Sequence, residues 1–157
     1  MKALIPATVI AFASAAALFN PAAAQNNKVT TPDQIVWGAG PASLPPGAEA
    51  AVLYGDPAKD GLFALRLKLP KGYIIPPHSH GKPEVVTVMS GTFRLGMGEK
   101  ADNSKAEALP AGSFFAIPPG TAHFASADED TVVQLNSIGP WTIMYVNPMD
   151  DPRQKSQ

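Results

Sequence analysis

The clearest pattern of apolar and polar residues lies in residues 65–69, where Leu65, Leu67 and Leu69 alternate with Arg66 and Lys68. Successive side chains of a strand point to opposite faces, so a period of two is typical of a strand with one buried face. This segment therefore predicts a strand whose leucines enter the core.

Similar short apolar segments recur from residue 48 onward, separated by turns rich in Gly and Pro. Residues 85–89 and 92–95 flank Ser90 and Gly91, a pattern that predicts two strands joined by a tight hairpin turn. No segment after residue 24 has a sustained helical period, and many short strands with turns between them predict an all-β sandwich or barrel. The further strands that we expect lie at residues 50–54, 73–75, 113–117, 131–135 and 142–146.

The first 24 residues have the layout of a secretory signal peptide. Met1 and Lys2 give a positive start, residues 4–19 are apolar and rich in alanine, and three alanines end at Ala24. Cleavage is expected between Ala24 and Gln25. The alternative is a membrane anchor, but the apolar run is shorter than the ~20 residues that a spanning helix needs. We therefore expect a mature protein in the periplasm or outside the cell, with no membrane attachment after cleavage.

The remaining chain divides into three parts by composition. Residues 25–47 are polar and rich in proline and predict an extended N-terminal arm, residues 48–148 hold the predicted barrel domain, and residues 149–157 form a polar tail. The chain has no cysteine, which excludes a disulfide framework and a thiolate metal site. Its formal charge is −1 without a cluster of Lys or Arg, so nucleic-acid binding is not supported.

The three histidines of the chain fall beside Pro- and Gly-rich turns. His78 and His80 are two residues apart, so both imidazoles would share one face of a strand. Glu84 follows a three-residue turn, and His123 comes three residues after Gly120. Three neutral imidazoles and one carboxylate would hold a divalent cation with a net charge near +1. The residues therefore predict a metal site, for which imidazole and carboxylate leave Fe, Mn, Ni, Cu and Zn open.

Two longer motifs carry a resemblance to a known family. Residues 72–91, GYIIPPHSHGKPEVVTVMSG, resemble the first motif of the cupin superfamily, and residues 112–127, GSFFAIPPGTAHFASA, resemble the second. The second motif departs once, because Ala127 stands where the family has Asn. The resemblance implies a single jelly-roll β-barrel with a metal in its interior, held by His78, His80, Glu84 and His123.

The resemblance leaves several functions open. We favour a metal-dependent oxidoreductase, similar to the cupin dioxygenases, that acts on a small organic molecule and uses Glu84 as a catalytic base. The alternatives are a redox-neutral isomerase, lyase or decarboxylase, and a non-enzymatic cupin that binds or senses a small molecule or metal. A homodimer is expected, because dimers are the commonest oligomers and frequent in this family.

Overall fold

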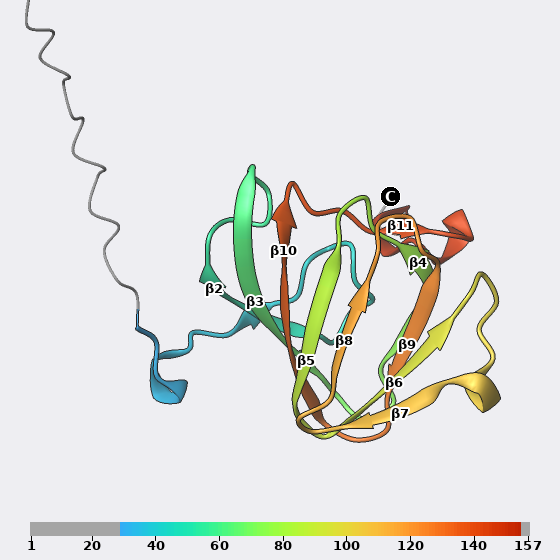
Figure 1. Ribbon diagram of the computed structural model, residues 1–157, viewed down its shortest axis with the longest axis horizontal. Coiled ribbons are helices and arrows are strands. Elements are labelled where there is room, and N and C mark those ends of the chain that lie inside the picture. The colour runs from blue at the N-terminus through green and yellow to red at the C-terminus, as the bar shows by residue number, and fades with distance from the viewer. Residues whose placement is uncertain (1–28, 155–157) are drawn as a thin grey trace, which may run out of the picture.

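The computed structural model describes residues 29–154 (Figure 1). The predicted signal peptide, its cleavage point and the last three residues of the tail lie outside these described residues. Within residues 29–154 no helix has the length and hydropathy needed to cross a lipid bilayer.

The described chain is all-β, as predicted. Six strands form one antiparallel sheet in the order β1-β2-β3-β10-β5-β8, and five form a second sheet in the order β11-β4-β9-β6-β7. The two sheets face each other in a jelly-roll arrangement (Figure 1) and are not joined into one continuous ladder. The strands are β1 (Gly38–Ala39), β2 (Glu49–Tyr54), β3 (Gly61–Leu69), β4 (Ile74–Ser79), β5 (Glu84–Ser90), β6 (Thr92–Met97), β7 (Glu107–Pro110), β8 (Phe114–Ile117), β9 (His123–Ala127), β10 (Thr131–Gly139) and β11 (Met144–Tyr145).

Short 3₁₀ turns are the only helical segments of residues 29–154. They lie in the N-terminal arm, in the loop between β6 and β7, and after β11, and none of their residues is buried. Their bounds are η1 (Pro32–Gln34), η2 (Asn103–Lys105), η3 (Pro148–Asp150) and η4 (Pro152–Gln154).

The core lies between the inner faces of the two sheets. Leu65, Leu67 and Leu69 of β3 are all buried there, so the alternation in the sequence predicted the buried face of this strand correctly. Burial of these side chains removes apolar surface from water and is the main source of stability for such a fold. The core side chains that join them include Ile75, Val86, Val88, Phe93, Ala125, Val133 and Leu135.

The connection between β5 and β6 differs from the predicted hairpin. Both strands are present and Gly91 has a positive φ of 76°. However, β5 pairs with β10 and β8, whereas β6 pairs with β9 and β7, so the turn passes from one sheet to the other. A Cβ at Gly91 would lie 2.5 Å from the carbonyl oxygen of Asp130. Glycine is therefore required by both the backbone conformation and this close approach.

The two ends of the described chain lie along sheet edges. In the arm, β1 pairs with β2, and the ammonium group of Lys68 lies 4.1 Å above the ring centre of Trp37. The strand predicted at residues 142–146 is reduced to β11, which pairs with β4 at His78 and Ser79.

Candidate metal centre

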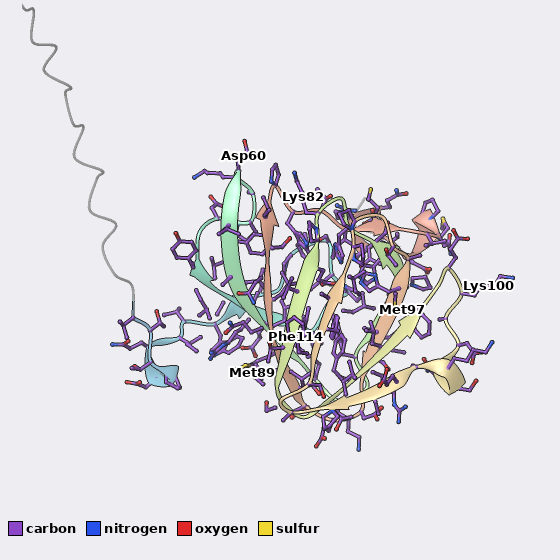
Figure 2. The ribbon with its side chains drawn as sticks, viewed as in Figure 1. Asp60, Lys82, Met89, Met97, Lys100 and Phe114 are labelled. Carbon is purple, nitrogen blue, oxygen red and sulfur yellow. The ribbon has the colours of Figure 1, made fainter. Side chains whose placement is uncertain are left out.

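All four predicted ligands lie at one end of the barrel. His78 is near the end of β4, His80 follows that strand, Glu84 begins β5 and His123 begins β9. His78 and His123 are direct partners across the β4–β9 ladder. Since β4 and β9 belong to one sheet and β5 to the other, the cluster spans both layers of the barrel. Figure 2 labels Lys82, in the turn between His80 and Glu84, at this end.

The four side chains are buried together. The exposed fractions of His78, His80, Glu84 and His123 are 4%, 3%, 8% and 2%. One ring nitrogen from each histidine lies within 4.8 Å of the other two, so the three buried histidines could hold a metal ion. Glu84 Oε2 lies 3.1 Å from His123 Nε2 and 3.6 Å from His80 Nε2. The structure therefore brings the four residues into one cluster.

The backbone fixes which ring nitrogen faces the cluster. His78 Nδ1 lies 2.8 Å from the Pro76 carbonyl oxygen, and His123 Nδ1 lies 3.0 Å from that of Thr121. His80 Nδ1 lies 2.9 Å from the Thr142 carbonyl oxygen. A carbonyl oxygen only accepts hydrogen bonds, so each Nδ1 carries the proton and donates it. In a neutral ring Nε2 then has a free lone pair, which is the form that binds metals.

An unpaired ring nitrogen and one close nitrogen–oxygen contact at the centre indicate that a cation fits there. Among the described residues, only His80 Nε2 and Trp141 Nε1 are buried side-chain N or O atoms without a hydrogen-bond partner. In addition, His123 Nε2 and the Glu84 carboxylate lie 3.1 Å apart, and with Nε2 unprotonated both would present lone pairs to each other. Such a contact requires a proton or a metal ion between the two atoms, and buried polar groups are seldom left unpaired.

Burial controls the ionisation of the cluster. It lowers the pKa of His78 to about 3, with a further contribution from the charge of His123, and it also lowers the pKa of His80. Burial alone would raise the pKa of Glu84, but its close contacts with His123 and His80 outweigh burial and hold that pKa below its ordinary value. At neutral pH the cluster thus contains neutral His78 and His80 rings and a charged carboxylate, as metal ligands must be.

The metal-free protein is expected to lose stability in mild acid. His78 has a pKa of about 3 when folded against 6.5 for the free side chain, so between these values the unfolded chain binds more protons. Stability is therefore fully present above pH 6.5 and falls as the pH drops toward 3. His78 alone would reduce the free energy of unfolding by about 2 kcal/mol between about pH 7.5 and about pH 5, and the lowered pKa of His80 acts in the same direction.

Urea denaturation of the metal-free protein at these two pH values measures this difference. In a His78→Gln variant the pH dependence should be smaller, because glutamine does not titrate. An equal free energy of unfolding at both pH values in the unsubstituted protein would contradict the ionisation described above.

A small apolar cavity adjoins the cluster. It has a volume of about 30 Å³, and the only polar side chains in its wall are His78, Glu84 and His123. A cavity of about 10–15 Å³ accepts one water, so the space beside the cluster admits only very small molecules. A larger organic molecule would need movement of the surrounding side chains, which are Leu67, Leu69, Ile75, Val86, Phe93, Leu95, Phe115, Ala125, Val133 and Leu135.

Sequence reasoning did not place Trp141 at this site. The side chain is partly buried and packs against the core. Its ring also stacks on that of His80, with a centre-to-centre distance of 4.5 Å and an interplanar angle of 17°. The ring of Tyr145 lies near His78, with 6.0 Å between the two ring centres. No local spacing links these aromatic residues to the motif histidines, so the sequence held no signal for their role.

Comparison with known proteins places the chain in a family. Residues 13–144 match the family described as a domain of unknown function, DUF4437. The chain is 34% identical over 87 residues to the germin-like protein subfamily 2 member 1 of Arabidopsis thaliana, a match that covers 52% of this chain and 40% of the plant protein. The chain thus spans about two fifths of the length of that relative.

Solved structures agree on the fold. An RmlC-like cupin from Shewanella frigidimarina has a TM-score of 0.55 at 18% identity, with 71% of this chain and 90% of that one covered. A putative acetylacetone dioxygenase from Methylibium petroleiphilum has a TM-score of 0.62 at 18% identity, with 80% and 85% covered. At such identities the likeness shows the fold alone. Together with the family match and the two motifs, it establishes that the chain belongs to the DUF4437 family and is a member of the cupin superfamily.

Proposed function

We propose that His78, His80, Glu84 and His123 hold one divalent transition metal, and that the protein is a metal-dependent oxidoreductase acting on a small organic molecule. The observation that carries the proposal is the set of three Nδ1–carbonyl hydrogen bonds, which leave three Nε2 lone pairs in one buried space beside a carboxylate. Imidazole and carboxylate together suit Fe, Mn, Ni, Cu and Zn, so the donor set defines the class of ion rather than its identity.

Each residue has a separate role in this proposal. The three imidazoles supply neutral donors, and the Glu84 carboxylate reduces the net charge of the buried centre to about +1. A bound transition metal would supply Lewis acidity and, for redox-active ions, electron transfer. Glu84 is the only carboxylate residue in the wall of the cavity, and a buried carboxylate within reach of a substrate can accept its proton. We therefore assign Glu84 a second role as catalytic base.

The cavity supports oxidation over redox-neutral chemistry. Its volume of about 30 Å³ and its apolar wall suit a small apolar molecule such as dioxygen better than an ion or a polar substrate. The organic substrate would reach the centre only after the lining opens, for example at Phe115, which is partly buried on the edge strand β8. The solved structure of a putative acetylacetone dioxygenase shares this fold, which is consistent with such chemistry.

Metal content and oxygen uptake test the proposal. Protein prepared without a His tag should contain close to one equivalent of a transition metal after reconstitution. The Fe, Mn, Ni and Cu forms should then be assayed for oxygen uptake with catechols, flavonols and small keto acids. Replacement of Glu84 by Gln keeps the size of the side chain but removes both the base and an anionic ligand. Uptake is therefore compared per bound metal ion, and we expect it to fall by about 100-fold or more.

A matched control is Glu99→Gln, which makes the same change at an exposed position and should leave uptake unchanged. Less than about half an equivalent of any metal after reconstitution would contradict the metal site. Full metal content with no oxygen uptake by any form would favour the redox-neutral enzyme or the binding protein instead.

We also propose that the protein functions outside the cytosol as a homodimer. The signal-peptide layout of residues 1–24 supports export, and the polar arm of residues 25–47 could contribute to contacts between two copies. N-terminal sequencing of the mature protein should begin at Gln25, and light scattering in solution should give twice the mass of one chain.

A further inference from the structure

The segment from Trp141 to Val146, termed here the C-terminal strap, lies across the end of β4 that carries the histidine cluster (Figure 1). Its β11 residues pair with β4, and the Val146 amide donates to the Pro77 carbonyl at 2.9 Å. Ile143 is almost completely buried, and the Tyr145 hydroxyl donates to the Ser43 carbonyl at 2.7 Å. The strap is therefore fixed to the barrel at several points.

His80 depends on this strap in a way that the other two histidines do not. The Nδ1 groups of His78 and His123 donate to carbonyls only two residues earlier in their own segments. The Nδ1 group of His80 donates to Thr142, which is 62 residues away and belongs to the strap. The orientation of His80 is thus set by a distant segment, whereas the other two rings are oriented locally.

Trp141 supplies the second constraint on the His80 ring. The indole lies nearly parallel to the imidazole, with an angle of 17° between the planes, and this fixes the plane of the His80 ring. The hydrogen bond from Nδ1 to the Thr142 carbonyl then fixes the rotation within that plane. Trp141 is itself held by a backbone hydrogen bond to Pro57 at 2.8 Å and by an edge contact with Phe63. Stacking and hydrogen bond together determine the direction of the His80 Nε2 lone pair.

We propose that Trp141 is a positioning residue for the metal centre, which acts by holding the His80 imidazole with Nε2 directed at the bound ion. The inference rests on the proposed metal site and extends it to a residue outside both sequence motifs. Residues that orient a metal ligand typically contribute a factor of about 10 to 100 to metal affinity. Loss of the indole should therefore lower the affinity for the metal ion without removing any ligand.

Cobalt(II) binding to three variants tests the proposal. Affinity is measured by competition with a chelator, and the visible absorption bands of bound cobalt report the ligand geometry. Trp141→Leu removes the aromatic face and should weaken cobalt binding about 10-fold or more and shift the bands. Trp141→Phe restores a flat ring and should recover most of the affinity. Trp37→Phe changes the other tryptophan, in the N-terminal arm, and should leave both affinity and spectrum unchanged.

The outcomes separate the two proposals. If the unsubstituted protein binds no cobalt, the metal site and the role of Trp141 both fail. If it binds cobalt, and folded Trp141→Leu shows the same affinity and spectrum, the metal site stands and the role of Trp141 is wrong. Circular dichroism establishes whether each variant is folded.

If Trp141→Leu does not fold, a fluorescence titration tests whether the intact Trp141 indole lies beside the bound ion, as a positioning role requires. The chain has two tryptophans, so Trp37→Phe leaves Trp141 as the single indole emitter. Copper(II) bound by His80 would lie next to the stacked indole and should quench this emission, with saturation at one equivalent. In Trp141→Phe, where Trp37 is the emitter, quenching should be much weaker. Unchanged Trp141 emission in copper-loaded protein would overturn the proposal.

Discussion

Replacement of His80 by Ala is expected to remove most of the bound metal while the barrel stays folded. The substitution deletes the only histidine whose Nε2 is buried without a hydrogen-bond partner, so no hydrogen bond of that atom is lost. The apolar core lies mainly between the sheets and does not depend on this ring. We expect metal affinity to fall by about 100-fold or more, since the loss of a ligand exceeds the effect of changing a residue that orients one.

Elemental analysis and chelator competition measure the affinity, and circular dichroism follows the fold. Lys82→Ala provides the control, because Lys82 lies in the same turn and carries no metal-binding donor in the proposal. Full metal occupancy in folded His80→Ala would show that the ligand assignment is wrong.

Replacement of Leu65 by Ala is expected to lower the free energy of unfolding by about 2–5 kcal/mol. Leu65 is 2% exposed on the inner face of β3, where a shorter side chain leaves a cavity that its neighbours fill only in part. Leu62 lies on the same strand but is 69% exposed. Leu62→Ala should therefore change the free energy of unfolding by only a few tenths of a kcal/mol.

Urea denaturation of both variants, with the same metal content as the unsubstituted protein, gives the comparison. The contrast is between two leucines of one strand, so differences in strand propensity cancel. Equal destabilisation by the two substitutions would contradict the assignment of the inner face of β3 to the core.

Local sequence patterns predicted eight of the eleven strands in residues 29–154 and the cluster of histidines, but they did not predict β1, β7 and β9. The alternation at Leu65, Leu67 and Leu69 predicts which face of β3 is buried. The spacing of His78 and His80 and the turn before Glu84 are patterns of a few residues that predict neighbouring side chains. The resemblance to the cupin motifs predicted that His123 joins them. Each of these signals is short in sequence, and so each could be identified without knowledge of distant contacts.

Contacts between distant segments could not be predicted in this way. The turn at Gly91 has the same local sequence whether it joins two strands of one sheet or connects two sheets. The pairing of β5 with β10 and of β6 with β9 places the two strands in different sheets. Likewise, the positions of Trp141 and Thr142 beside His80 depend on the path of the strap, and residues 141–146 have no pattern that specifies it.

The origin of the His80 hydrogen bond has a consequence for the order in which the centre is completed. His78 and His123 are oriented by carbonyls two residues earlier in the chain, but the carbonyl that orients His80 is supplied by Thr142 in the strap. During synthesis the earlier strands emerge first and can begin to pair, yet an ion captured at that stage would meet a ring that still rotates freely. Tight capture should begin only when the strap has docked against β4, so that metal retention would report this docking step.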